Sequence, residues 1–193
     1  LLASNDNWEG TAALASAFAA AGAFSLPTTS RDAAIAGKLP ARSYTAQLQS
    51  TDALTGVALA ELYDLNQSGM GPRFANLSVR ARTGVGEEIL TAGFVVSGTG
   101  SVTLLVRAIG PSLAQFGVEG TVADPRVRVK NQAGAIVAEN DDWAGAPSLA
   151  SAFARAGAFG LALTSKDAAL VVTFPAGQYF VETVGEGAGI TLI

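Results

Sequence analysis

The chain has 193 residues, of which 49% are hydrophobic and 15% are charged, and its net charge is −4. It contains neither Cys nor His, which excludes disulfides, thiolate nucleophiles, Ser-His-Asp triads and the usual zinc sites. The hydrophobic fraction excludes a disordered chain, the negative charge argues against nucleic acid as a partner, and no apolar run is long enough for a membrane span.

In chain order, the first predicted element is a helix over residues 13–21, because Ala and Leu have high helix propensity and Gly22 suits the C-terminal stop. Alternating apolar and polar residues then predict strands. These strands cover residues 33–39, 44–49, 57–63, 74–82, 89–96 and 102–108. Residues 40–42 are predicted as a turn, and residues 66–72 and 98–101 as linker-like loops.

The C-terminal part begins with a predicted hairpin. Its first strand covers 126–130, with Val127 and Val129 on one face, and a tight turn at 131–134 leads to a strand over 135–138. The remaining predicted elements are a helix over 148–156, ended by Gly157, and strands over 168–174 and 179–184, separated by a turn at 175–178.

The chain also repeats itself at an offset of 135 residues. Residues 1–50 match residues 136–185 at 24 of 50 positions without a gap, and after a two-residue deletion residues 56–60 align with 189–193. We therefore predict that residues 1–66 are the C-terminal part of one repeat, 67–72 a linker, and 73–193 a second repeat lacking its last strand. Such a chain is a window on a longer array, a subunit completed by its neighbours, or a stretch with an arbitrary boundary.

Many short strands joined by Gly- and Pro-rich turns predict an all-β fold. The repeat makes it a tandem β-sandwich, jelly-roll-like, with one short inserted helix per repeat.

Two equivalent acidic loops are the best candidate sites, at residues 140–143 and 5–8. Closely spaced carboxylate and amide oxygens are what a hard cation such as Ca²⁺ needs, and an aspartate after each helix could return to the same loop. The candidate ligands are Asn140, Asp141, Asp142 and Asp167, with Asn5, Asp6, Asn7 and Asp32 in the other copy. The alternative is structural: Asn and Asp close an Asx-turn beside a tryptophan that plugs the core.

Other patterns favour structure over chemistry. Ser112 follows Gly110 and Pro111 but lacks a Gly-x-Ser-x-Gly elbow or an activating His, so it is predicted to cap a short helix. Exposed aromatics could form a sugar-binding platform, but four of the five Trp and Tyr residues occupy repeat-equivalent positions, which favours core packing. These five are Trp8, Trp143, Tyr44, Tyr63 and Tyr179.

A family resemblance rests on five stretches of the second copy. They are Asp124-Pro-Arg-Val-Arg-Val, Gly134-Ala-Ile-Val-Ala-Glu-Asn-Asp-Asp-Trp143, Asp167-Ala-Ala-Leu, Pro175-Ala-Gly-Gln-Tyr179 and Gly187-Ala-Gly189. In order and spacing they resemble the bacterial pre-peptidase C-terminal domain family, in a repeat form found in long bacterial surface proteins. The chain departs from that pattern by its Ala-rich helix and by residues 73–122.

The resemblance implies a secreted, non-catalytic β-sandwich, some members of which bind calcium through the acidic loop and attach to polysaccharide. We therefore expect an extracellular, cell-surface structural or adhesive module, not an enzyme. Its expected partner is itself, in a fibre assembled by strand sharing at an open edge beside residues 189–193. The alternative is a carbohydrate-binding module of a secreted protein.

Overall fold

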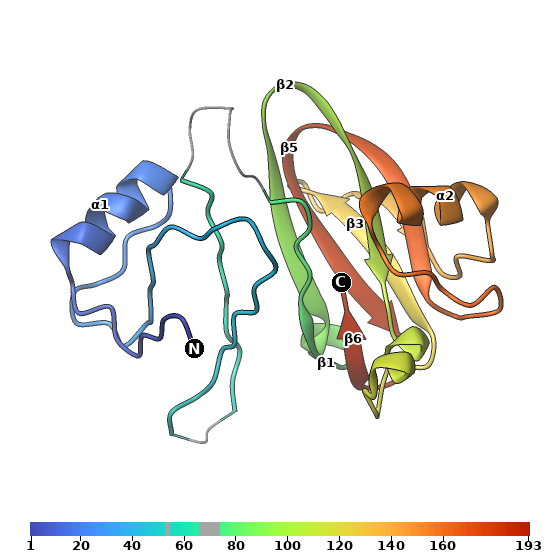
Figure 1. Cartoon of the computed structure of the whole chain (residues 1–193), viewed down its shortest axis with the longest axis horizontal. Coiled ribbons are helices and arrows are strands. Elements are labelled where there is room, and N and C mark those ends of the chain that lie inside the picture. Colours follow the sequence, from blue (N-terminus) through green and yellow to red (C-terminus); the bar gives the residue numbers. More distant parts are fainter. Residues whose placement is uncertain (53–54, 66–73) are drawn as a thin grey trace. The chain divides into compact units, whose positions relative to one another are not determined.

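The computed structural model describes residues 1–52, 55–65 and 74–193, and it divides the chain into two compact units, Leu1–Ala75 and Asn76–Ile193 (Figure 1). The linker predicted at residues 67–72 lies outside the described residues. Strands dominate the regular structure of the second unit, and short helices accompany them. The chain therefore has a β-rich fold, as its sequence predicts.

The second unit contains two sheets. In the larger sheet the strand order is β2-β5-β3-β4, and in the smaller sheet β1 pairs with β6; every neighbouring pair is antiparallel. The strands are β1 (Arg80–Thr83), β2 (Leu90–Ala108), β3 (Pro125–Asn131), β4 (Ile136–Asn140), β5 (Ala168–Gly185) and β6 (Gly189–Leu192). The helices are η1 (Gly86–Glu88), η2 (Pro111–Phe116) and α2 (Pro147–Ala156).

The predicted hairpin is confirmed. The strand predicted at 126–130 lies within β3, and Val127 and Val129 are fully buried. At the turn, the amide of Gly134 donates to the Asn131 carbonyl at 2.9 Å, and the Asn131 side chain accepts from the amides of Ala133 and Ala135. The short-range pattern of alternating valines and a turn-forming Asn was sufficient to predict this element.

Strands β2 and β5 are each longer than predicted. Residues 98–101 were expected to form a loop and 175–178 a turn, but both segments lie inside strands, at a bulge where the pairing shifts between Val96 and Ser101. Gly98 and Gly100 have φ angles of 82° and 105°, which let the strand bend there without ending. The strand predicted at 74–82 is shorter than expected, since β1 begins only at Arg80.

The edge expected to be open beside residues 189–193 is occupied. Strand β6 pairs with β1 on one side, and isolated bridges join Ile109 to Leu192 and Thr121 to Ile190. These partners come from residues 80–121, which the sequence pattern alone did not place next to the C-terminus. A strand from another chain would therefore have to bind elsewhere.

The core of the second unit has two clusters. In the first, the ring of Phe94 on β2 lies 5.2 Å from the rings of both Phe174 and Tyr179 on β5, so residues on either side of the bulge contribute to one core. In the second cluster, Trp143 packs beside Phe153, which lies on α2. The other buried members include Ile109, Leu113 and Leu161. Helix α2 is therefore held to the strands by its apolar face.

The first unit contains the predicted helix, α1 (Ala12–Ala21), ended by Gly22 in the left-handed conformation. The strands predicted at 33–39, 44–49 and 57–63 are not formed, and the described residues of this unit contain no strand. In the second unit β5 pairs with both β2 and β3. The described residues of the first unit contain no counterpart of β2 or β3. A strand without neighbours leaves its backbone groups to water and is unstable, so this segment stays irregular.

Candidate functional site

The acidic loop of the second unit is closed by hydrogen bonds to backbone atoms. The side chain of Asn140 donates to the Asp142 carbonyl at 3.0 Å and accepts from the Ala169 amide at 2.9 Å. The Trp143 amide donates to the Asp167 carbonyl at 2.9 Å, and its indole donates to the Ala162 carbonyl at 2.9 Å. The two ends of the segment around α2 are thus joined beside a buried tryptophan, which is the structural alternative that the sequence left open.

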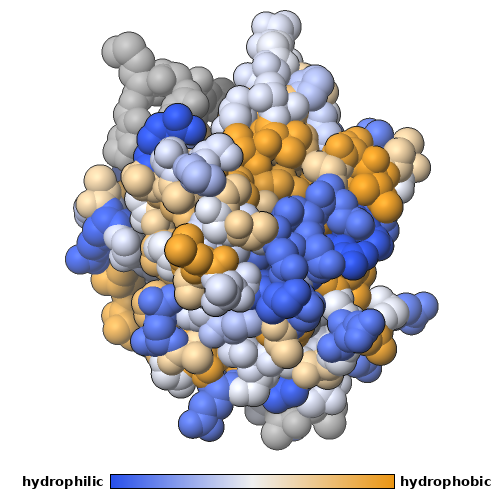
Figure 2. Space-filling view, turned by 90° about the vertical axis from the view of Figure 1, so that its right-hand side faces the viewer, coloured by the Kyte–Doolittle hydropathy of each residue, from blue (hydrophilic) through white to orange (hydrophobic). Residues whose placement is uncertain are grey.

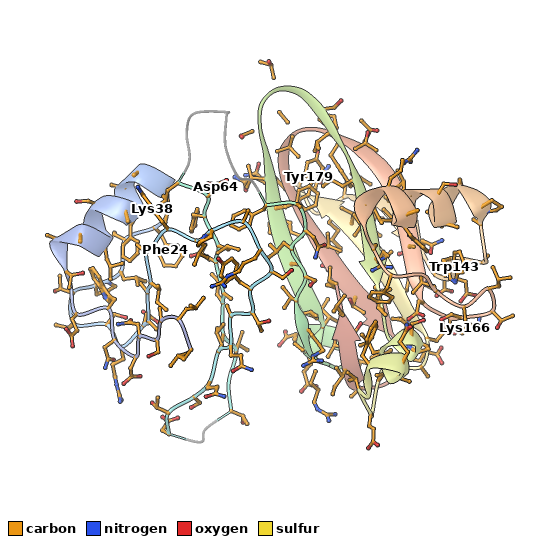
Figure 3. All side chains as sticks on the ribbon, in the orientation of Figure 1. Phe24, Lys38, Asp64, Trp143, Lys166 and Tyr179 are labelled. Carbon is orange, nitrogen blue, oxygen red and sulfur yellow. The ribbon has the colours of Figure 1, made fainter. Side chains whose placement is uncertain are left out.

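The two carboxylates of the loop face cations that the chain itself supplies. Asp141 pairs with Arg126 at 3.0 Å, and Asp142 pairs with Lys166 at 2.8 Å; Lys166 also lies 3.7 Å from Asp124. The hydrogen bond that Lys166 donates to Asp142 raises the pKa of the Lys166 ammonium, and the neighbouring charge of Asp124 adds to this effect. In Figure 3, Lys166 and Trp143 lie on the same side of the second unit.

Asp167 is fully buried and directs its carboxylate at another loop. It accepts from the Gly110 amide at 2.7 Å, from the Ser112 amide at 3.3 Å, and from the hydroxyls of Ser112 and Ser165. Gly110 precedes the first turn of η2, so Asp167 caps that helix from a distance of 57 residues along the chain. Ser112, which the sequence predicted as the cap, instead donates to the residue that caps.

Gly110 is required at this position by its surroundings. A Cβ atom there would lie 2.1 Å from the Val122 carbonyl oxygen, which is far closer than atoms approach. The backbone of Gly110 can therefore lie against the backbone of Val122 only because it has no side chain.

Sequence reasoning missed Arg107. Its guanidinium lies 4.4 Å from the ring centre of Phe159 and 5.2 Å from that of Phe153, and it donates to the Phe159 carbonyl at 2.7 Å. Burial lowers the pKa of Arg107, and the charge of Asp167 opposes that shift. No local pattern marks this arginine, because its partners lie about fifty residues further along the chain.

The first unit repeats the local bonds of this site. The Asn5 side chain donates to the Asn7 carbonyl and accepts from the Ala34 amide, and the Trp8 amide donates to the Asp32 carbonyl at 2.9 Å. The carboxylate of Asp32 is exposed, however, and accepts from the Ser30 hydroxyl. Asp6 accepts from the Asn7 side chain at 3.3 Å.

The candidate calcium ligands of the second unit thus contact different groups of the chain. Asn140, Asp141 and Asp142 share one loop, whereas the Asp167 carboxylate is committed to Gly110 and Ser112. Within the described parts of the chain, no group of three acidic side chains lies close together. Asp141 and Asp142 are paired with Arg126 and Lys166, and calcium binding stays a prediction.

Replacing Lys166 with alanine tests the prediction of calcium binding. Removal of the ammonium leaves Asp142 and Asp124 without their shared cation, so we expect millimolar CaCl₂ to raise the Tm of Lys166→Ala more than that of the parent chain. Differential scanning fluorimetry with MgCl₂ as the ionic-strength control measures the difference. Equal Tm changes in the two proteins would contradict a calcium site in this loop.

Three of the five Trp and Tyr side chains are buried. Trp8 and Trp143 are each 3% exposed, and Tyr179 lies among the strands (Figure 3). The face turned to the viewer in Figure 2 carries a continuous hydrophilic area with separate hydrophobic patches beside it. The predicted core role is confirmed for Trp8, Trp143 and Tyr179 and is wrong for Tyr44, which is 36% exposed.

Comparisons with known proteins add no assignment: no family model, no curated protein and no solved structure matches the chain. Within the described residues, no helix has both the length and the apolar character needed to cross a membrane.

Proposed function

We propose that this chain is a non-catalytic structural module of an extracellular, cell-surface fibre, in which neighbouring subunits share strands. The observation that carries the proposal is the contrast between the two copies of the repeat. Ile35 and Leu39 are 61% and 56% exposed in the first unit, whereas their counterparts Leu170 and Phe174 are 8% and 1% exposed.

This contrast points to assembly because Ile35 and Leu39 are exposed and the described residues of the first unit form no strand. Burying apolar surface of this kind stabilises an assembly by about 25 cal/mol per Å² of surface removed from water. Unpaired backbone groups in an extended segment are templates for pairing with another strand. A contact of this type joins two different surfaces, and it builds a linear polymer where the rotation between subunits does not close a ring.

The finer aspects of the proposal rest on the sequence. The order and spacing of the motifs that resemble the pre-peptidase C-terminal family support a β-sandwich in each complete repeat and a secreted location. The absence of cysteine suits an oxidising environment, where free thiols react. Among the described residues, no observation specifically favours the alternative of a carbohydrate-binding module, because the two tryptophans are buried.

Self-association of the full chain tests the proposal. We expect the weight-average mass, measured by sedimentation velocity, to rise with protein concentration. The double variant Ile35→Ser with Leu39→Ser removes two large apolar side chains, each worth about 1.5–3 kcal/mol when buried, so its association constant should fall at least tenfold.

The matched control is Val95→Ser, which changes a side chain that is 67% exposed in the second unit. It should associate like the parent. A parent chain that stays monomeric at every concentration, or a double variant that associates as well as the parent, would contradict assembly through the first unit.

A further inference from the structure

The first unit keeps the short-range contacts of the repeat and lacks the long-range ones. The Tyr44 hydroxyl donates to the Pro40 carbonyl at 2.7 Å, as Tyr179 does to Pro175 at 3.1 Å. The ring of Tyr179 also stacks on Phe94 at 5.2 Å, and the described first unit holds no counterpart of that phenylalanine. The short-range bonds of Asn5, Trp8 and Tyr44 therefore have the form that they take in the complete unit.

The contacts of Asp167 indicate which groups a binding partner of the first unit would present to Asp32. Its counterpart Asp167 is buried and receives the backbone amides of Gly110 and Ser112, whereas Asp32 is exposed and accepts from its neighbour Ser30. A carboxylate held in this position is complementary to the amides of a Gly-Pro-Ser turn.

Two aromatic rings that precede Asp32 in the sequence indicate a second feature of the missing partner. Phe18 and Phe24 are the counterparts of Phe153 and Phe159, between which Arg107 places its guanidinium. Phe24 is 57% exposed, and the described first unit has no arginine over either ring. The complementary group is therefore an arginine three residues before the glycine of the turn, as in Arg107-Ala-Ile-Gly-Pro-Ser112.

The strand pairing of the second unit also indicates what the first unit lacks. In the second unit β5 pairs with β2 and β3, and β6 pairs with β1. The equivalents of β5 and β6 in the first unit, at residues 33–50 and 56–59, have no strand neighbours among the described residues, and Leu59 is 73% exposed. All the missing contacts come from residues 76–131.

We propose, on the basis of the assembly function above, that residues 1–65 are the C-terminal half of a split unit. They bind a polypeptide segment with the sequence pattern of residues 76–131, and its Arg-Ala-Ile-Gly-Pro-Ser stretch docks on Asp32, Phe18 and Phe24. The occupant is a further copy of that segment, because the copy in this chain already pairs with β4, β5 and β6.

The repeat offset supplies a direct test. Leu1 is the counterpart of Ile136, so an added copy of residues 76–135 joined directly to Leu1 produces one uninterrupted repeat ahead of the second unit. Hydrogen exchange of the whole extended protein, measured by mass spectrometry, reports each unit separately. We expect amides at 34–39, 44–49 and 56–59 to exchange about 100-fold or more slowly than in the parent chain.

Matched variants assign the effect to the proposed contacts. Asp32→Asn should remove most of this protection in the extended protein and change nothing in the parent, where Asp32 is exposed. Alanine in place of the added arginine equivalent to Arg107 should weaken protection around Phe24 but leave that of the second unit unchanged.

The second unit is an internal reference for folding. Protection that is retained there and absent from residues 34–59 would overturn the proposal. Loss of protection in the second unit would show that the added segment displaces residues 76–131 instead, and it would contradict the proposal as well. Both proteins are compared at a concentration at which the parent chain is monomeric, so that self-association of the parent does not contribute to the protection.

The result is independent of the self-association test. If the parent stays monomeric but the extended protein orders residues 34–59, the fibre proposal fails and the split unit stands. If the parent assembles and the extended protein shows no ordering of residues 34–59, the fibre proposal stands and the split unit fails.

Discussion

Replacing Phe174 with alanine is expected to destabilise the second unit by about 4 kcal/mol. Phe174 is 1% exposed, and its ring packs 5.2 Å from Phe94 and 4.8 Å from Tyr179 in the first core cluster. Removing a buried phenylalanine ring forfeits its transfer free energy and leaves a cavity that the two rigid rings cannot close, which typically costs about 3–5 kcal/mol. Urea unfolding followed by Trp143 fluorescence, in a Trp8→Phe background, measures the loss.

The internal repeat provides the control for this substitution. Leu39 occupies the position equivalent to Phe174 but is 56% exposed. Leu39→Ala should therefore change the free energy of unfolding of the second unit by less than about 0.5 kcal/mol. A Phe174→Ala protein that unfolds at the same urea concentration as the parent would contradict the assignment of β2 and β5 to one core.

Replacing Asp167 with alanine is the second large expected effect, a loss of about 3 kcal/mol in the second unit. The change leaves the amides of Gly110 and Ser112 and two serine hydroxyls without the acceptor that they share. Buried donors without partners cost roughly 1–3 kcal/mol each, partly recovered where water reaches the hydroxyls. The same fluorescence measurement in urea reports this loss.

Asp32→Ala is the matched control, since Asp32 is exposed and has no amide partner of this kind in the first unit. It should leave the second unit unchanged. Comparable losses from Asp32→Ala and Asp167→Ala would mean that the long-range cap contributes nothing, and the role assigned to Gly110 and Ser112 would be wrong.

The parts of the fold that depend on neighbours in sequence could be predicted. Both helices begin within one residue of their predicted positions, because Ala and Leu favour the helix and a left-handed glycine ends it. The hairpin at β3 and β4 was predicted equally well from alternating valines and an Asn turn. The structural version of the acidic loop, an Asx-type closure beside a buried tryptophan, was also available from the sequence.

The candidate site could be predicted only in part. The loop at 140–143 was identified, but the partners of its charges were not, because Lys166 follows it by a whole helix and Arg126 precedes it by a hairpin. The contacts of Asp167 with Gly110, and of Arg107 with Phe159, join residues more than fifty positions apart. Pairs of this separation leave no periodic trace in a single sequence.

The sequence by itself determined the repeat, the helices, the hairpin turn at 131–134 and the closed loop around each tryptophan. Only the tertiary structure decided which predicted strands exist: the segment 168–185 is a strand between β2 and β3, and the related segment 33–50 is not. The physical reason is that helices and Asx-turns satisfy their backbone groups within a few residues, whereas a strand needs partners from elsewhere in the chain. Two segments related by the repeat therefore differ in structure because one of them has neighbours.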